Sequence, residues 1–283
     1  MTVETIVLEA NGLAFTADAA GPEGGELVLL LHGYPQTRHT WRAELPALAA
    51  AGYRAVAPDQ RGYSPGARPD GIDAYRVEHL VADALALAGV AGADRFDLVG
   101  HDWGGQIAWL MAAHHPERVR SLSVLSRPHP AAFVRAMSAD PGQSERSSHH
   151  RSFRRPEATD EQLADGAARL RRGLVRMGVP AADVDVYLGT LGQRPVMDAA
   201  INWYRAAGGS GLRAADTPAV TGPTLYVWGD EDSSVGRMAA EGTADFVEGP
   251  YRFVELPGIG HFVTDQDPAA FPPLLLEHLR ARS

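Results

Sequence analysis

The chain contains no cysteine, no excess of positive charge and no long hydrophobic run, and each absence removes a class of function. Without cysteine, disulfides, thiolate metal sites and cysteine nucleophiles are all excluded. Every apolar stretch is far shorter than the roughly 18 residues that a membrane-spanning helix requires. The first residues carry no basic region followed by a long apolar segment, so we expect no signal peptide and a cytoplasmic location.

The charge balance excludes further partners. The chain has 26 basic residues, all of them arginine, against 35 acidic residues, which gives a net charge of −9 at pH 7. This excess of negative charge argues against binding to nucleic acid or to an anionic membrane surface. We therefore expect a small-molecule partner, and the sequence leaves the formation of a homodimer open. A length of 283 residues, with 45% hydrophobic and 22% charged residues, is typical of one large globular domain with an inserted subdomain.

Short apolar runs alternate with helical patterns in residues 1–126 and 222–283. The turn Asn11-Gly12 between the first two runs is a strong hairpin signal. The pattern predicts strands at 3–9, 13–18, 27–31, 54–57, 95–99, 119–125, 224–228 and 251–256. It predicts helices at 41–51, 74–88 and 269–280, besides one that follows residue 105. This alternation is typical of an α/β fold with a mostly parallel sheet and helices on both faces.

Residues 127–221 lack any buried-strand run and show helical patterns instead. Thr159 and Gln162 form a capping-box signature, and four apolar residues follow at helical spacing: Leu163, Ala167, Leu170 and Leu174. Further helices are expected after Pro180 and from Pro195 to Ala207, the latter closed by Gly208-Gly209. We expect this insertion to form a helical lid over the carboxyl ends of the strands, where ligands bind in open α/β sheets.

The stretch Gly100-His-Asp-Trp-Gly-Gly105 lies between a predicted strand and a predicted helix. Strand, sharp glycine-flanked turn and helix form the context of a nucleophile elbow, in which one residue is held in strained backbone above the sheet edge. Asp102 occupies the place that serine usually takes. An aspartate carboxylate, with a reference pKa of about 3.9, is already an anion at neutral pH. It can therefore displace a leaving group from saturated carbon directly and form an ester.

Two residues late in the chain complete a catalytic set in the order expected after such an elbow. His261 lies in a loop after the last predicted strand and is the candidate base, although loop histidines are often plain surface residues. Asp232 follows the strand that ends at Trp228 and is the candidate acid that orients the histidine. Asp230 competes for this role, and the G-x-x-D spacing favours Asp232.

Three motifs, Gly100–Gly105, His32-Gly-Tyr-Pro35 and Asn202-Trp-Tyr-Arg205, make the chain resemble the α/β-hydrolase family over nearly its whole length. The resemblance is to the branch of epoxide hydrolases and haloalkane dehalogenases, and more to the epoxide hydrolases. It implies an oxyanion hole formed by the backbone N–H groups of Tyr34 and Trp103, and a cis peptide bond after Tyr34. We expect no cofactor and no metal, because no pair of histidines or carboxylates has convincing ligand spacing.

The resemblance also points to hydrogen-bond donors in the lid. Tyr204 would donate to the alkoxide that epoxide opening creates, since a tyrosine is protonated at neutral pH. Met197, Ile201 and Tyr204 also fall on one helical face, so a plain core position is the alternative. A second lid tyrosine, usual in the family, is missing here, and His149 stands nearest to its place and could donate instead. Further candidates for substrate contacts in the lid are His150, Tyr187 and Trp203.

Basic residues are concentrated in one part of the predicted lid. Between residues 146 and 176 the chain has eight arginines and four acidic residues, a local balance of +4. In an acidic protein this pattern raises the hypothesis of substrates that bear a carboxylate or phosphate. The alternative is a solvated face of the lid, which charge runs usually form.

The sequence thus predicts a cofactor-free hydrolase that opens an epoxide to a vicinal diol through an ester on Asp102, hydrolysed by water that His261 and Asp232 activate. Haloalkane or haloacid dehalogenation by the same ester route is the first alternative, with the indole of Trp103 as one halide donor. Tyr34 stands where haloalkane dehalogenases frequently have asparagine, which weakens this alternative. A ligand-binding or biosynthetic protein without hydrolytic activity is the second. The complete catalytic set speaks against it, because an idle site has no physical reason to keep all three residues.

Overall fold

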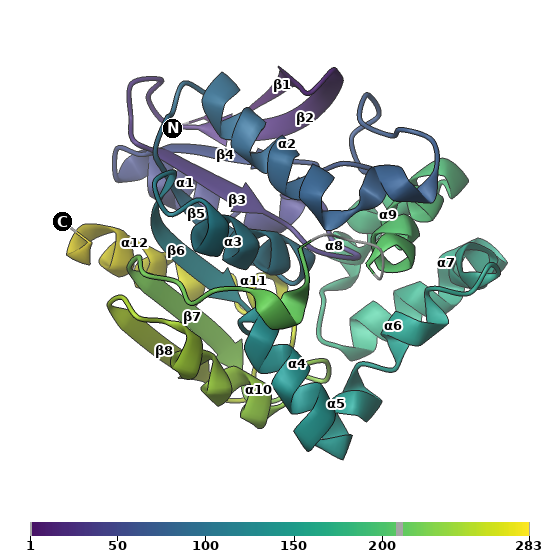
Figure 1. Ribbon diagram of the computed structural model, residues 1–283. Helices are drawn as coiled ribbons and strands as arrows, with labels where there is room; N and C mark the ends of the chain where they lie inside the picture. Colours follow the sequence, from purple (N-terminus) through teal and green to yellow (C-terminus); the bar gives the residue numbers. More distant parts are fainter. Residues whose placement is uncertain (1, 208–211, 283) are drawn as a thin grey trace.

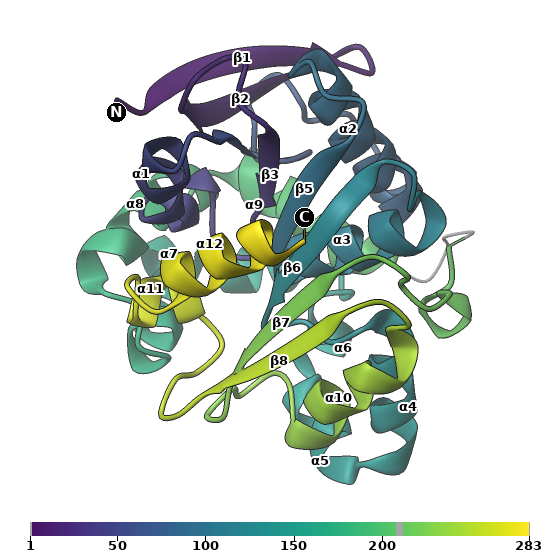
Figure 2. The ribbon, with the colours of Figure 1, turned by 90° about the vertical axis from the view of Figure 1, so that its left-hand side faces the viewer.

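The computed structural model describes residues 2–207 and 212–282, and among them eight strands form one sheet. The strands are β1 (Glu4–Ala10), β2 (Leu13–Ala20), β3 (Leu27–Leu31), β4 (Arg54–Pro58), β5 (Phe96–His101), β6 (Val119–Leu125), β7 (Thr224–Gly229) and β8 (Tyr251–Leu256). Their order across the sheet is β1-β2-β4-β3-β5-β6-β7-β8, and Figure 2 shows β1 at the top and β8 at the bottom. β2 pairs antiparallel with β1 and with β4, whereas all other pairs are parallel.

The strand predictions are confirmed. Each of the eight predicted strands is present, and the predicted ends differ from the observed ones by no more than 2 residues. In the turn between β1 and β2, Asn11 has a φ of 52° and Gly12 a φ of 74°, the positive values that a tight Asn-Gly hairpin turn requires. The sheet is therefore mostly parallel with an antiparallel edge, as the sequence indicated.

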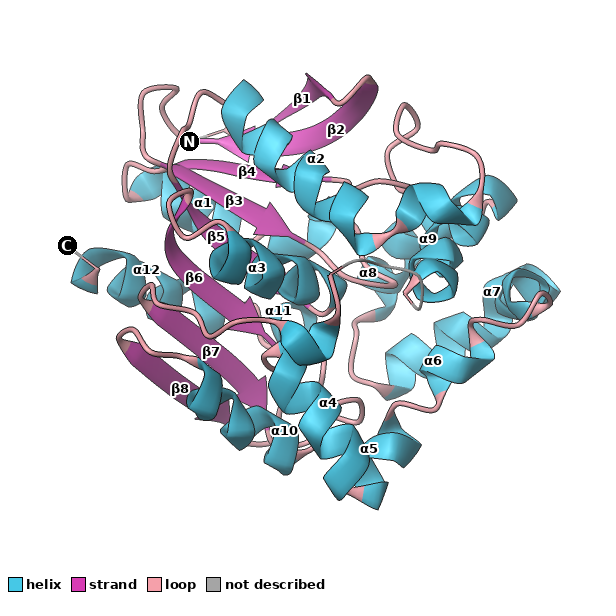
Figure 3. Cartoon of the chain, in the orientation of Figure 1, coloured by secondary structure: helices cyan, strands magenta, loops and turns pink. Residues whose placement is uncertain are grey.

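Helices cover both faces of the sheet (Figures 1 and 3). Outside the region between β6 and β7, they are α1 (Glu44–Ala50), α2 (Val77–Val90), α3 (Trp103–His114), α10 (Arg237–Glu241), α11 (Val263–Gln266) and α12 (Phe271–Ala281). Short 3-10 helices are η1 (Arg38–Trp41), η2 (Ile72–Tyr75), η3 (Ala214–Asp216) and η4 (Gly242–Phe246).

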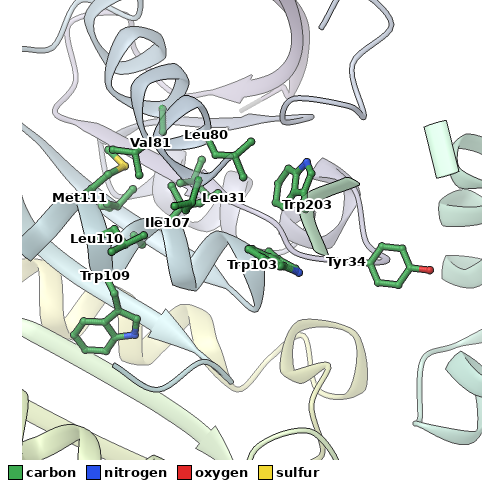
Figure 4. Close-up of a cluster of buried hydrophobic side chains, with 14 of the residues drawn as sticks. Leu31, Tyr34, Leu80, Val81, Trp103, Ile107, Trp109, Leu110, Met111 and Trp203 are labelled. Carbon is green, nitrogen blue, oxygen red and sulfur yellow. The ribbon is translucent and has the colours of Figure 1, made fainter. Parts of the chain in front are cut away.

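The alternation of side chains along β3 explains why both faces need cover. All of its residues are buried and apolar, and successive side chains point to opposite faces. Leu29 and Leu31 belong to the apolar cluster that includes residues of α2 and α3, as Figure 4 shows for Leu31. Val28 and Leu30 belong to the cluster formed with α1 and α12.

Between β6 and β7 lies the helical insert, which comprises six α-helices and η3 within the described residues. The α-helices are α4 (Pro130–Ala139), α5 (Pro141–Arg146), α6 (His149–Ser152), α7 (Ala158–Arg176), α8 (Ala181–Leu191) and α9 (Arg194–Ala206). In Figures 1 and 3 the arrows of β3, β6 and β7 point toward this insert. The insert therefore lies at the carboxyl edge of the sheet, where the sequence placed it.

Two helices start 3 residues later than predicted. The helix expected at 41–51 begins at Glu44, after η1, because Pro46 lacks an N–H group and fits only within a first helical turn. The helix expected at 74–88 begins at Val77, because Arg76 has an extended backbone with a ψ of 146°.

The prediction for the start of α7 is wrong. The helix begins at Ala158, and Thr159 lies inside it with its hydroxyl bonded to Asp198, so there is no capping box. Its backbone leaves the helical conformation at 164–167, where Asp165 and Gly166 have positive φ values. This interruption breaks the expected apolar periodicity. The predicted stop at Gly208-Gly209 lies outside the described residues. None of the described helices is long and apolar enough to cross a membrane.

Candidate active site

Asp102 occupies the sharp turn between β5 and α3, at the carboxyl edge of the sheet. Its φ of 51° and ψ of −115° lie in a region that residues other than glycine rarely adopt, as in a nucleophile elbow. A Cβ on Gly100 would lie 2.4 Å from the carbonyl oxygen of Gly104, and a Cβ on Gly104 would lie 2.0 Å from that of Leu31. Glycine at these positions therefore lets the strand and the helix approach closely around Asp102.

The loop after β3 contacts the carboxylate of Asp102. The N–H of Tyr34 donates to Asp102 Oδ1 at 2.9 Å, and a Cβ on Gly33 would lie 2.4 Å from the same oxygen. The peptide bond between Tyr34 and Pro35 is cis, as the resemblance implied. Trp103 follows Asp102 and is the first residue of α3, where N–H groups have no partner within the helix. The two amides expected to form an oxyanion hole are those of Tyr34 and Trp103. The N–H of Tyr34 contacts the carboxylate of Asp102, and Trp103 directly follows Asp102 in the chain.

His261 brings Asp102 and Asp232 into one cluster. Its Nδ1 lies 2.9 Å from Asp232 Oδ2, and its Nε2 lies 3.5 Å from Asp102 Oδ2. The second oxygen of Asp232 accepts hydrogen bonds from the backbone N–H groups of Ser234 at 2.7 Å and Val235 at 3.0 Å. These bonds fix the carboxylate that orients the imidazole.

Two neighbouring residues support the position of His261. Asp230, which competed with Asp232 in the sequence, instead accepts the N–H of Gly258 at 2.7 Å. His101 Nε2 lies 2.8 Å from the carbonyl oxygen of His261 and donates to it, because that oxygen can only accept. Burial lowers the pKa of His101 to about 4, so its ring is neutral at pH 7. His101 therefore tethers the backbone of the loop that carries His261.

Asp102 and His261 influence each other's protonation. Burial raises the pKa of Asp102, but the hydrogen bond and positive charge of His261 outweigh it and hold this pKa well below its usual range. Burial lowers the pKa of His261, but the carboxylates of Asp232 and Asp102 outweigh it and raise this pKa to about 10. The resting site thus holds an ionised aspartate beside a protonated imidazole.

A cavity of about 430 Å³ connects this cluster with the helical insert. Its volume falls within the range of sites for small organic molecules. Asp102 and His261 line it from the core, while α6, α7 and α9 line it from the insert. Its apolar side chains include Pro35, Phe153, Leu170, Leu174, Met177 and Phe262.

Tyr204 lines this cavity from α9 and is 3% exposed. Its ring packs edge-to-face against Tyr34 and Trp103, with centroids 5.6 and 5.2 Å apart. Burial raises the pKa of Tyr204 well above its usual value, and the negative charge of Asp102 raises it further. The phenol therefore keeps its proton and remains a hydrogen-bond donor. Tyr204 thus lies both in the core cluster and on the cavity wall, so the two alternatives for this residue are not exclusive.

The other residues of the Asn-Trp-Tyr-Arg motif make contacts outside the cavity. Trp203 is 1% exposed, and its indole N–H donates to the carbonyl oxygen of Arg61 at 3.0 Å. Trp203 packs against Trp103 (Figure 4). It is absent from the cavity lining and so does not lie in the place expected of a substrate contact. Arg205 donates to the side chain of Asn202 at 2.9 Å.

Tyr187 is also absent from the cavity lining. It is fully buried in α8, and its hydroxyl donates to Asp265 Oδ1 at 2.7 Å. Arg42 donates to the same oxygen at 2.9 Å and to Asp183 of α8 at 2.7 Å. Tyr187 therefore helps to attach α8 to the core and lies outside the position expected of a substrate contact.

His149 and His150 lie on α6 beside Tyr204, and of the two His149 lines the cavity. His150 stacks on Phe133 instead. His149 Nδ1 lies 3.2 Å from the carbonyl oxygen of Arg146, which can only accept, so the neutral ring carries its proton on Nδ1. Burial lowers the pKa of His149 and favours this neutral ring. Its Nε2 is then an acceptor, contrary to the donor role that we expected.

Gln162 and Phe153 are cavity residues that sequence reasoning missed. Gln162 Oε1 accepts a hydrogen bond from the hydroxyl of Tyr34 at 3.3 Å, and the ring of Phe153 lies 4.8 Å from that of Tyr204. The capping-box pattern assigned Gln162 a local role. No signal in the sequence indicated that its side chain reaches across to the loop after β3.

Comparisons with known proteins agree with this fold. Residues 26–268 match the family model for the alpha/beta hydrolase fold. AB hydrolase superfamily protein YfhM from Bacillus subtilis is 33% identical over 280 residues, which is 96% of each chain. Epoxide hydrolase A from Mycobacterium tuberculosis is 31% identical over 314 residues, again 96% of each chain.

Solved structures show the same similarity. The crystal structure of Epoxide Hydrolase A from Mycobacterium thermoresistibile has a TM-score of 0.84 at 28% identity, and the match covers 99% of this chain and 98% of that one. The chain therefore belongs to the alpha/beta hydrolase fold family, as an epoxide hydrolase-like member.

Proposed function

We propose that this protein opens an epoxide to a vicinal diol through a covalent ester on Asp102. The observation that carries the proposal is that an ionised Asp102 and a protonated Tyr204 line the same cavity. Ring opening needs this pair, because a nucleophile must attack the ring carbon while the ring oxygen gains negative charge. The insert, residues 127–221, serves as the lid that brings Tyr204 to the nucleophile. The relatives named epoxide hydrolases support the same reaction.

In the first step, a carboxylate oxygen of Asp102 forms a bond to one ring carbon, and the bond between that carbon and the ring oxygen breaks. The oxygen receives a hydrogen bond and then the proton of Tyr204. His261 holds Asp102 ionised before the attack, because its positive charge lowers the pKa of the carboxyl group. The product of this step is a hydroxyalkyl ester.

In the second step, neutral His261 removes a proton from water, and the hydroxide attacks the ester carbonyl carbon of Asp102. Ester formation prepares this step, because it removes one of the two negative charges that raise the pKa of His261. The proton that His261 loses restores the phenol of Tyr204. The N–H groups of Tyr34 and Trp103 bind the oxyanion of the tetrahedral intermediate, an effect worth about 3 kcal/mol per donor. Collapse of the intermediate breaks the bond between the carbonyl carbon and the alkyl oxygen, and this oxygen takes the hydroxyl proton of the intermediate. The diol then leaves, the carboxylate of Asp102 is regenerated, and His261 is again protonated.

Intact-protein mass spectrometry of the His261→Gln variant tests the proposal. This variant keeps the nucleophile but lacks the base, so the ester accumulates when an epoxide is added. The protein mass then rises by the full mass of the epoxide, because ring opening expels no leaving group. The double variant Asp102→Asn, His261→Gln is the matched control and gains no mass.

The same experiment separates the alternatives. A haloalkane dehalogenase adds only the alkyl group, because the halide leaves, and it forms this adduct with haloalkanes and none with epoxides. A ligand-binding protein without hydrolytic activity forms no adduct with either class of compound. Either result rejects the proposed epoxide opening.

A further inference from the structure

One face of α7 combines an apolar stripe with a positive charge at its far end. Leu170, Gly173, Leu174 and Met177 line the cavity with the spacing of a single helix face. Arg169 lines the same cavity next to the first of them. The face therefore offers a path for an apolar chain, followed by a guanidinium group.

The Met177 end of this face is tied to the loop that carries His261. The side-chain amide of Gln266 donates to the carbonyl oxygen of Met177, and its oxygen accepts the N–H of Gly260 at 2.6 Å. Arg169 precedes Met177 by 8 residues, which corresponds to ~12 Å along a helix axis. Arg169 thus marks the end of the cavity remote from the reacting groups.

Arg169 has no carboxylate partner among residues 2–207 and 212–282. The other cavity arginines differ from it. Arg155 donates to both carboxylate oxygens of Glu161, at 2.7 and 2.5 Å, and these two charges compensate each other. Arg146 donates to the carbonyl oxygen of Asp232 at 3.0 Å, which carries no formal charge. The positive charges of Arg146 and Arg169 therefore remain unbalanced at the cavity.

The charge at the remote end of the cavity suits a single anionic group. A protonated His261 between the carboxylates of Asp102 and Asp232 leaves one negative charge among the reacting groups, and the positive charge of Arg146, which bonds to the carbonyl oxygen of Asp232, offsets it. The remaining positive charge is that of Arg169, although the protein has a net charge of −9. Charges more than about 10 Å away are largely screened at physiological ionic strength, so the local excess governs recognition.

We propose that the cavity takes epoxides that carry one carboxylate at the end of an apolar spacer, and that Arg169 binds this carboxylate. The inference rests on the proposed epoxide opening and assigns its substrate class. The epoxide ring lies at Asp102, the spacer lies against the stripe from Leu170 to Met177, and the carboxylate reaches the guanidinium group. Arginine suits this role because its planar donors match both oxygens of a carboxylate.

A series of terminal epoxy carboxylates of increasing chain length, each paired with its primary amide, tests the inference. For long members the wild-type protein is expected to prefer the carboxylate by about fivefold in kcat/KM, the upper range for one exposed charge pair. The preference resides in KM, because the contact is remote from the reacting bond. For glycidate, whose carboxylate adjoins the ring, no preference is expected, since its carboxylate stays beside Asp102 and cannot extend along the helix face to Arg169.

The Arg169→Gln variant abolishes the preference, and added salt weakens it in the wild type. The Arg172→Gln variant is the matched control. Arg172 lies on the same helix, is exposed and is absent from the cavity lining, so this variant keeps the wild-type preference. Equal rates for long carboxylates and amides in the wild type, or equal behaviour of the two variants, overturn the assignment while the proposed function stands. If neither carboxylates nor amides are hydrolysed, the proposed function itself fails and the inference falls with it.

Discussion

The Nε2 atom of His261 lies 3.5 Å from Oδ2 of Asp102, and each group sets the protonation of the other. In the proposed reaction this one contact serves two opposite needs. Before attack, the protonated imidazole keeps the nucleophile ionised. After attack, the loss of the carboxylate charge lowers the pKa of the imidazole and lets it act as a base. The chemistry of the first step thus prepares the second.

The Asp102→Asn variant tests this coupling, because asparagine keeps the size of aspartate and mimics the uncharged ester. The pKa of His261 is raised to about 10 by two carboxylates, so the removal of one must lower it. We expect a fall of about one to three pH units. Nitrogen chemical shifts of the imidazole, followed by NMR across pH, measure it. The Asp230→Asn variant is the control and leaves this pKa in place, since Asp230 bonds to Gly258 instead. An unchanged titration in Asp102→Asn would contradict the coupling.

The Tyr204→Phe variant is expected to reduce kcat for epoxides by roughly 10²–10⁴-fold, the usual contribution of a positioned proton donor. The Tyr187→Phe variant loses a hydroxyl of the same kind outside the cavity, where it bonds to Asp265. This control should lower the melting temperature and leave kcat close to that of the wild type. Steady-state kinetics with a terminal epoxide compare the two. Similar losses of kcat in both variants would assign Tyr204 to packing alone.

The His149→Phe variant separates a donor from an acceptor. His149 lines the cavity, and with its proton on Nδ1 the neutral ring has only an acceptor left, so its removal should change kcat for simple epoxides by less than about threefold. The readout is kcat from pH 6 to 9, compared with that of Tyr204→Phe. A loss as large as that of Tyr204→Phe, which grows as pH rises, would show that a protonated His149 donates to the substrate.

The Asp232→Asn variant removes the charge that Nδ1 of His261 contacts at 2.9 Å. Ester hydrolysis should slow by roughly 10²–10⁴-fold, because the imidazole loses the partner that orients it and stabilises its protonated form. Rapid-quench kinetics should then show a burst of ester followed by slow turnover. The Asp230→Asn variant serves as the control with near wild-type turnover. A slow turnover in Asp230→Asn alone would reverse the assignment of the acid.

The sequence predicted those features that depend on local pattern. The continuous apolar run of β3 predicted a strand buried on both faces, and the glycines around Asp102 predicted a strained turn, because each depends on near neighbours in the chain. The G-x-x-D spacing likewise selected Asp232, the aspartate that contacts His261.

Features that depend on individual contacts and backbone angles escaped prediction. The ring of His149 is oriented by its contact with the carbonyl oxygen of Arg146. The indole of Trp203 is held in the core by its hydrogen bond to the carbonyl oxygen of Arg61. The interruption of α7 near Gly166 also left no clear trace, because one glycine within a helical pattern is compatible with an uninterrupted helix.

A single turnover in water enriched in oxygen-18, with enzyme in excess over epoxide, tests the ester on Asp102 most directly. We expect the first molecules of diol to contain no label, because their new oxygen comes from the carboxylate, and we expect the label to appear in Asp102. Diol labelled in the first turnover, with an unlabelled carboxylate, would mean that water attacks the ring directly and would contradict the account.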